Sequence, residues 1–283
     1  MSELKQVKEY LSTATGTQGT LLIPRKIYQS IIMEADKFLI PRSEAALYFG
    51  PGDIPGSSID LNLMTPDTMD IRETGEGADI VIDNAEYTNS NVKPRKYAVA
   101  VRITRELMED AQWNLLDHSI KIAGKRFAEN ENSLIITALD GAANTVSGGA
   151  AVTIANITRA MQYLEDSDYR GTTFFVGMEV LNDLRNIDTF VEANKMGNRE
   201  LLAQGFTGVL YGLSVIRVST NAGMTTTSSY VTDRENAYVI AEKRPITIEN
   251  FDLPSNDMSA TAITQRIAVS SLRTSAIAKI TSS

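Results

Sequence analysis

The sequence that decides the fold is residues 104–139: TRELMEDAQWNLLDHSIKIAGKRFAENENSLIITAL. This stretch contains no Pro and a single Gly, Gly124. Thr104 can cap its amino end, and the acids that follow suit the positive end of a helix dipole. Small or apolar residues then recur at helical spacing: Leu116, Ile120, Ala123, Phe127, Leu134 and Ala138. We therefore expect one helix of about 54 Å, in which Glu131 interrupts the apolar face and marks a bend or a partner.

The composition is that of an ordinary globular protein, with 43% hydrophobic and 22% charged residues. No apolar run is long enough to cross a bilayer. The first residues lack an apolar signal segment, so we expect the chain to stay in the cytoplasm where it is made. The chain has no Cys and one His, His118. This excludes disulfides, thiolate zinc sites, cysteine nucleophiles and multi-histidine metal sites.

The net charge of −8 is concentrated in residues 51–92. This segment has one base, Arg72, and the acids Asp53, Asp60, Asp67, Asp70, Glu73, Glu76, Asp79, Asp83 and Glu86. Acids and bases balance in the rest of the chain, so we expect no strongly basic face for tight nucleic-acid binding. The acidic segment is either a solvated loop or a surface complementary to a partner.

Two stretches on either side of the acidic segment alternate between apolar and polar residues. Ile59, Leu61 and Leu63 alternate within residues 58–64, and a second alternation covers residues 97–103. We interpret them as the strands of one long two-stranded ribbon. Such a ribbon is marginally stable alone, so it needs another surface to lie on.

The remaining segments predict an α+β architecture with a mixed-sheet subdomain after the long helix. Residues 1–20 suggest a mobile arm, and a short helix with one apolar side follows at about 24–35. Residues 141–151 suggest a small-residue linker. Later helices are expected at 156–166 and 178–185, and strands at 173–176, 213–218, 237–241, 263–269 and 276–280.

No combination of residues predicts an enzyme. His118 lies mid-helix, and no Gly-x-Ser-x-Gly elbow exists to complete a serine triad. Asp166 and Asp168 could serve a small acid-dependent hydrolase or open a calcium loop, but the Gly and Glu that such a loop needs are missing. A helix end is the simpler interpretation. The glycine pairs match no phosphate-binding fingerprint, and we expect no catalytic residue, no cofactor and no metal site.

Two groups of bases could receive the acidic loop of a neighbouring copy. Residues 93–96 are either a solvated start of a strand or an ionic contact, and a second group lies on the long helix. Exposed ion pairs contribute only ~0–1 kcal/mol each, so they would set register more than strength. The predicted assembly interface comprises Asp67, Asp70, Glu73, Glu76, Asp79, Lys93, Arg95, Lys121, Lys125 and Arg126.

Several short stretches occur in an order typical of one family. They are GTQGTLLIP at 16–24, EGA at 76–78, VKPRKYAVAVRITRELMED at 92–110, AENE at 128–131, LYGLSV at 210–215 and RIAV at 266–269. Together they resemble the major capsid proteins of tailed phages, which have the Hong Kong 97 fold. No single motif is specific; the likeness rests on their order and spacing over nearly the whole chain.

The resemblance implies an α+β fold with a long spine helix, an extended β-ribbon loop and a mixed-sheet axial domain. The implied parts are an N-terminal arm and first helix (1–50), the loop (51–96), a peripheral domain (97–141 and 236–265) and an axial domain (142–235 and 266–283). It also implies a shell protein of the virion, assembled in the host cytoplasm into pentamers and hexamers of an icosahedral head. The head would enclose double-stranded DNA without sequence-specific binding and without a membrane, and separate scaffold, portal and decoration proteins are candidate partners.

Two departures from the family pattern change these expectations. Some members crosslink a loop Lys to an Asn of a neighbour, but this chain has no Lys from Ser43 to Val92. Non-covalent contacts or a decoration protein would replace that link. The long scaffolding segment that some members cut away is also missing, which favours a separate scaffold protein or a processed chain. The nearest alternative is the shell of an encapsulin-like nanocompartment, which has the same fold.

Overall fold

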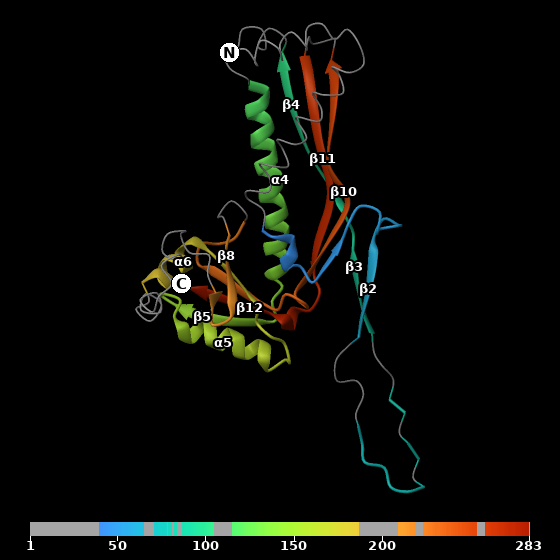
Figure 1. The fold of residues 1–283 in the computed structure, drawn as a ribbon, viewed down its shortest axis with the longest axis vertical. Coiled ribbons are helices and arrows are strands. Elements are labelled where there is room, and N and C mark those ends of the chain that lie inside the picture. The colour runs from blue at the N-terminus through green and yellow to red at the C-terminus, as the bar shows by residue number, and fades with distance from the viewer. Residues whose placement is uncertain are drawn as a thin grey trace, which may run out of the picture.

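The computed structural model describes residues 40–64, 71–77, 79–80, 82–83, 87–104, 115–186, 209–218, 223–253 and 258–282. Within these residues the chain forms three sheets in an elongated molecule (Figure 1). A long helix stands beside a tall sheet, a second sheet with its helices lies at one end, and a two-stranded ribbon projects away from both. The predicted α+β fold class is confirmed.

The tall sheet has four strands in the order β1–β10–β11–β4. β10 (Tyr238–Leu253) and β11 (Met258–Ser271) form an antiparallel pair, β4 (Arg95–Thr104) is antiparallel to β11, and β1 (Leu47–Phe49) is parallel to β10. The long helix α4 (Leu115–Leu139) packs along this sheet, where Ala123 and Phe127 contact Ile263. Burial of this apolar stripe holds the helix parallel to the strands (Figure 1).

The predicted long helix is present as α4, which covers 25 residues of the described chain. Its predicted amino-terminal part falls on residues 105–114, which lie outside the described residues. In its second half Ala128, Ile135, Ile136 and Leu139 are buried, whereas the predicted Leu134 and Ala138 are only half-buried. The buried face is displaced because Glu131 and Asn132 also point inward, where polar groups satisfy them.

The ribbon consists of β2 (Ile59–Met64) and β3 (Tyr87–Val92), paired antiparallel. The prediction that residues 97–103 form its second strand is wrong, because those residues belong to β4 of the tall sheet. The sequence of β3, YTNSNV, is almost wholly polar and shows no apolar alternation. The base of the ribbon packs against the tall sheet of the same subunit, where Ile54 and Val92 are buried beside Val239 and Ala241 of β10.

The second sheet has six strands in the order β5–β12–β9–β6–β8–β7. They are β5 (Asn144–Gly149), β12 (Ile277–Ser282), β9 (Ser228–Thr232), β6 (Thr173–Val176), β8 (Leu213–Arg217) and β7 (Val209–Leu210). β5 is parallel to β12 and β6 to β8, so the sheet is mixed, as expected. The linker predicted at 141–151 is wrong, because its small, polar residues form the edge strand β5.

The two helices predicted at 156–166 and 178–185 are present as α5 (Ile154–Glu165) and α6 (Met178–Arg185), and both pack against the six-stranded sheet. Neighbouring residues of β6 point to opposite faces, so Phe174 joins the core under these helices and Phe175 joins the core shared with α4. Asp166 caps the end of α5 and Asp168 takes a φ of 61° in the turn that follows. The interpretation of these aspartates as a helix end is confirmed.

Some predicted features lie outside the described residues: the arm at 1–20, the short helix at 24–35, Asp67 and Asp70. No helix in the described part of the chain is both long and apolar enough to span a membrane.

Candidate assembly surfaces

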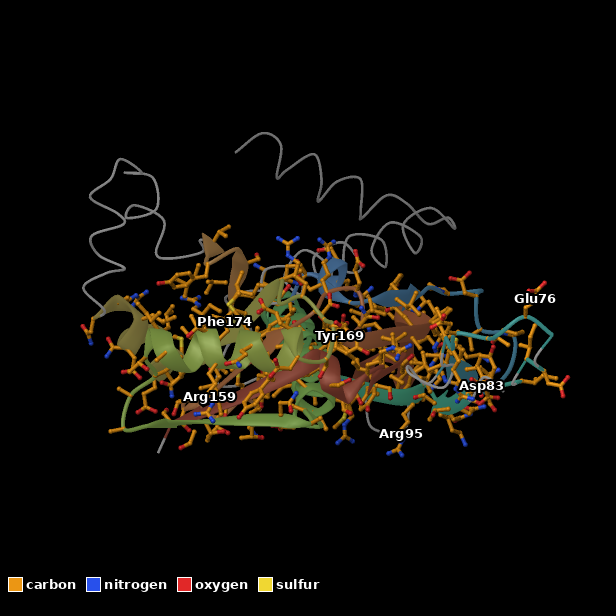
Figure 2. All side chains as sticks on the ribbon, turned by 90° about the horizontal axis from the view of Figure 1, so that it is seen from below. Glu76, Asp83, Arg95, Arg159, Tyr169 and Phe174 are labelled. Carbon is orange, nitrogen blue, oxygen red and sulfur yellow. The ribbon has the colours of Figure 1, made fainter. Side chains whose placement is uncertain are left out.

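The far end of the ribbon, residues 71–83, which we call the ribbon tip, exposes apolar side chains. Ile71 is fully exposed, Ile80 is 79% exposed and Ile82 is 87% exposed. Burying such a side chain contributes about 1.5–3 kcal/mol, so leaving three in water is costly. Glu76 and Asp83 lie at the outer end of this protrusion, far from Phe174 in the core of the six-stranded sheet (Figure 2). The tip therefore has an apolar surface that the described residues of its own subunit leave exposed.

The ribbon tip is also acidic. Glu73, Glu76 and Asp79 are exposed, and none of them forms an ion pair with another residue that the structure describes. The single base of the tip, Arg72, forms an ion pair with Asp83, in which Arg72 Nη2 lies 3.7 Å from Asp83 Oδ1. Three of the predicted interface residues thus lie together on the tip, next to the exposed isoleucines.

The bases at the start of β4 face solvent. Lys93 and Arg95 are exposed on either side of the buried Pro94, and Arg95 projects outward from the body of the molecule (Figure 2). Pro94 accepts a hydrogen bond from Arg266 at 3.4 Å through its carbonyl oxygen, which holds this turn against β11. These two predicted interface residues are therefore accessible to another molecule.

The three bases predicted on the long helix already have contacts within the subunit. Arg126 Nη1 lies 2.8 Å from Glu129 Oε2, and Lys125 Nζ lies 3.9 Å from Glu129 Oε1. The third base, Lys121, is exposed and also has a contact of its own. Spacings of three and four residues place such side chains together on a helix, so the sequence already contained this signal. The structure does not bring these bases to the ribbon tip of the same subunit.

A buried ionic network, which the sequence did not reveal, joins the segment before β1 to α4 and β10. Arg42 binds Glu131 through two N–H groups, at 2.7 and 2.8 Å, and Glu242 through two more, at 2.9 and 3.3 Å. The side chains of Glu131 and Glu242 are 2% and 4% exposed. The sequence showed that Glu131 interrupts the apolar face of the helix, and the structure shows that Glu131 binds Arg42 there.

Two further groups complete the network around Glu242. Tyr48 donates to Glu242 Oε2 at 2.6 Å, and Gln265 donates to Glu242 Oε1 at 3.0 Å. Burial alone would raise the pKa of Glu242, but these hydrogen bonds and the charge of Arg42 outweigh burial and lower it. Burial, with the hydrogen bond to Glu242, raises the pKa of Tyr48 to about 12. Glu242 is therefore ionised at neutral pH, whereas Tyr48 keeps its proton and donates it to Glu242.

Residues 40–49 connect both sheets. The backbone N–H of Ile40 donates to Asn132 of α4 at 2.9 Å, and Thr173 of β6 donates to Glu44 at 2.5 Å. The backbone oxygen of Ser43 accepts a hydrogen bond from Arg234. This segment therefore links α4 and the tall sheet to the six-stranded sheet.

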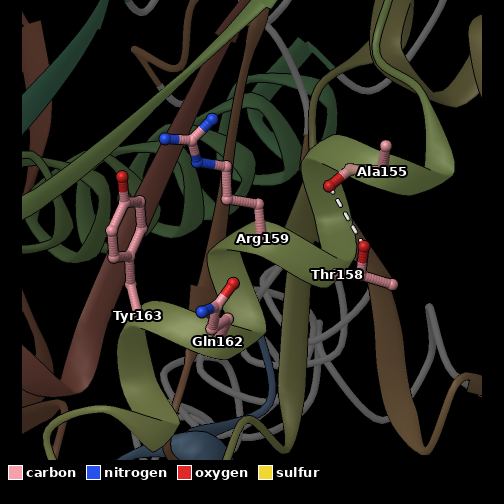
Figure 3. Close-up of a pocket in the computed structure, with 5 residues that line it drawn as sticks. All are labelled: Ala155, Thr158, Arg159, Gln162 and Tyr163. Carbon is pink, nitrogen blue, oxygen red and sulfur yellow. Dashed lines mark hydrogen bonds between the residues drawn. The ribbon is translucent and has the colours of Figure 1, made fainter.

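A hollow on α5 is lined by Ala155, Thr158, Arg159, Gln162 and Tyr163 (Figure 3). The guanidinium of Arg159 lies 5.8 Å from the centre of the Tyr163 ring, and the Thr158 hydroxyl donates to the carbonyl oxygen of Ala155 at 3.1 Å. These five residues include no acid and no paired nucleophile. In the described part of the chain, no three His, Asp or Glu side chains group as a metal site would require.

Comparison with known proteins identifies the family. The sequence of residues 87–280 matches the family described as phage capsid protein. The chain belongs to this family. The match covers β3, β4, α4, β10, β11 and nearly all of the six-stranded sheet, whereas β1 and β2 lie outside it. No curated protein sequence matches the chain.

Solved structures of phage proteins have the same fold as this phage capsid protein. One from Microbacterium phage Oxtober96 superimposes with a TM-score of 0.65 at 16% identity, covering 85% of this chain and 90% of that one. One from Mycobacterium phage Che8 superimposes with a TM-score of 0.66 at 13% identity, covering 80% of this chain and 84% of that one. The mature capsid of bacteriophage PhiM1 gives 0.65 at 10% identity, with 87% of each chain covered. The fold is the Hong Kong 97 fold, and the resemblance to tailed-phage major capsid proteins is confirmed.

Proposed function

We propose that this phage capsid protein builds the icosahedral head of a tailed phage by assembling into pentamers and hexamers that enclose double-stranded DNA. The observation that carries the proposal is the ribbon tip, whose isoleucines and whose acids Glu73, Glu76 and Asp79 are exposed in the described part of the subunit. A copy that covers the tip of the next copy makes a head-to-tail contact, and such contacts close into rings when the rotation permits. The family match favours the phage head over the nanocompartment shell.

The interface in this proposal consists of the predicted acids, Asp67, Asp70, Glu73, Glu76 and Asp79, and the predicted bases, Lys93, Arg95, Lys121, Lys125 and Arg126. The proposed division of the subunit is a loop (51–96), a peripheral domain (97–141 and 236–265) and an axial domain (142–235 and 266–283), preceded by an arm (1–50). Assembly takes place in the host cytoplasm, and scaffold, portal and decoration proteins are the further partners proposed. The proposal assigns no catalytic step to the chain.

Electron microscopy of the purified protein tests this function. We expect closed particles or flat sheets of hexamers in negative stain, because either product covers the ribbon tips. Denaturing gels of those particles should show the monomer alone, since no Lys lies between Ser43 and Val92 for the covalent link of some relatives. A protein that remains a monodisperse monomer or dimer at every salt and protein concentration would contradict the proposal.

A further inference from the structure

β5 forms an open edge of the six-stranded sheet. It pairs with β12 along one side, and no strand of the described chain pairs with its other side. Natural proteins protect such edges with charged residues, Pro or a covering element, because the unpaired backbone groups can bind a further strand. The sequence of β5, NTVSGG, contains neither a charged residue nor a Pro. This edge is therefore able to accept another strand.

Helix α5 covers this edge only in part. The side chain of Asn156 donates to the carbonyl oxygen of Ser147 at 2.8 Å, so this oxygen points away from β12. Backbone groups of successive strand residues point in opposite directions, and those of Thr145, two residues earlier, therefore also point outward. The N–H of Ser147 and both backbone groups of Thr145 face no strand of the described chain. An added strand would pair with these groups.

A hollow lies beside these groups, between the edge of β5 and α5. Its walls include Thr145, Val146 and Ser147 of β5 and Asn156, Arg159 and Tyr163 of α5. Its volume of about 330 Å³ is at the lower end of the range for ligand pockets, so it suits one or two side chains rather than a large cofactor. A strand added to the edge would place every second side chain on the face of this hollow.

Arg159 gives the hollow a positive charge without a counter-charge. Its side chain is exposed, and it forms no ion pair with any acid that the structure describes. The guanidinium lies 5.8 Å from the centre of the Tyr163 ring, and the two side chains project side by side from α5 (Figure 3). The ring orients the guanidinium, and the planar guanidinium can bind a carboxylate through two parallel hydrogen bonds.

We propose that an extended segment of a partner protein adds to the edge of β5 and places an Asp or Glu side chain on Arg159. Arg159 and Tyr163 are about one helical turn, or 5.4 Å, apart along α5. Alternate side chains of a strand are about 6.7 Å apart, so the partner residue two positions from the acid lies near the Tyr163 ring. An apolar side chain suits that position, because Tyr163 is half-buried and packs against the core under α5.

In this mode of binding, backbone pairing provides affinity and the pockets for alternate side chains provide specificity. The site lies on the six-stranded sheet and uses neither the ribbon nor any residue of the predicted assembly interface. It does not rest on the proposed function, because a single subunit contains the whole site.

Binding of a synthetic peptide to the full-length chain tests the proposal. The probe is fluorescein-labelled Thr-Val-Thr-Asp-Thr-Val-Thr with an amidated end, in which an apolar residue stands two positions from the acid on either side. We expect saturable binding in fluorescence anisotropy, weakened about tenfold or more when Asn replaces the Asp, because the charged pair is lost. Arg159→Ala should weaken binding of the Asp peptide equally and should bind both peptides alike. The matched control Arg170→Ala changes an exposed base outside the hollow and should bind like wild type.

Methylation of the peptide backbone provides a second readout that does not depend on charge. Two versions of the peptide carry methyl groups on alternate backbone nitrogens, offset by one residue. One version should lose binding and the other should keep it, because only every second N–H of an added strand faces the edge. Thr145→Pro removes an outward N–H at a position where an edge strand tolerates Pro. This variant should melt like wild type and should no longer bind the peptide.

The proposal is overturned if no peptide binds saturably, if the Asp and Asn peptides bind equally, or if both methylated versions bind alike. Full displacement of the peptide by an equal concentration of inorganic phosphate would show a general anion site and would also overturn it. None of these results bears on the formation of particles, so the proposed function stands or falls separately.

Discussion

Replacing Arg42 by Met tests whether the buried network holds the subunit together. Glu131 loses both N–H donors, at 2.7 and 2.8 Å, whereas Glu242 keeps Tyr48 and Gln265. Each hydrogen bond to a charged group contributes about 1.5–3 kcal/mol. Removing one partner of a buried pair costs about 3–5 kcal/mol. Because the Arg42 side chain is 32% exposed and water can replace part of it, we expect the free energy of unfolding to fall by about 3 kcal/mol.

The assay is urea unfolding of the unassembled subunit, followed by circular dichroism at pH 7 and at pH 4. The folded-state pKa of Glu242 lies below the usual 4.5, so its stabilising contribution is present above that value and is lost as the pH falls. The difference between wild type and Arg42→Met should therefore be largest at pH 7 and should shrink at pH 4.

Two further variants separate charge from geometry. Arg42→Lys keeps the charge but not the paired donors, so its loss should be intermediate. Adding Glu131→Gln to Arg42→Met removes the orphaned charge and should recover part of the stability, which makes the two changes non-additive. The reasoning is refuted if Arg42→Met unfolds at the wild-type urea concentration, or if its deficit is the same at both pH values.

The remaining predictions concern the tip and the packing of the six-stranded sheet. The double variant Ile80→Asp with Ile82→Asp should leave the melting temperature of the subunit unchanged, because both side chains are exposed. Its particles should disappear from sedimentation profiles. Particles at wild-type yield would show that these side chains are not buried on assembly. Gly177→Ala should lower the free energy of unfolding by about 1–3 kcal/mol, because a Cβ there would lie 2.6 Å from the carbonyl oxygen of Thr226. Its matched control, Gly75→Ala, has open space around it and should unfold like wild type. Tyr230→Phe removes the 2.6 Å hydrogen bond to Asp140 and should cost about 1 kcal/mol in urea unfolding, and an unchanged urea midpoint would show that water replaces this bond.

The elements that the sequence predicted well are those whose apolar residues follow a period. In α5, Ile157, Ala160 and Leu164 recur at helical spacing and are all buried. β6 is a continuous apolar run, and all four of its residues are buried. In both elements the pattern exists because one side, or both sides, must face the core. The sequence alone was sufficient there.

The elements that the sequence missed have no apolar pattern to read. β3 is polar because most of it faces solvent in the ribbon, and β5 is a small-residue strand at the edge of its sheet. Both are held by the backbone of a partner strand, β2 or β12, and local composition does not identify that partner. Residues 97–103 do alternate, but their pattern does not identify the partner strand, so they were assigned to the ribbon instead of to the tall sheet.

The sequence predicted only part of the exposed and paired charge that the structure shows, and the interface itself stays a prediction. The sequence located the acidic tip and the bases beside Pro94, because the clustering of charge is visible in one dimension. It did not locate the Arg42 network, whose members are separated by 89 and 200 residues. It also overlooked that Glu129, three and four residues from two of the helix bases, would pair with them. Contacts between distant residues depend on topology, and only the structure supplies that.

Hydrogen–deuterium exchange of the ribbon tip tests the central claim most directly. Backbone amides of residues 71–77, 79–80 and 82–83 should exchange rapidly in the unassembled subunit, because all of these residues except the half-buried Asp83 are exposed. In assembled particles their exchange should slow by about tenfold or more, as expected for amides that gain a stable partner. Equal exchange of these amides in subunits and particles would mean that the tip needs no neighbour, and would contradict the account.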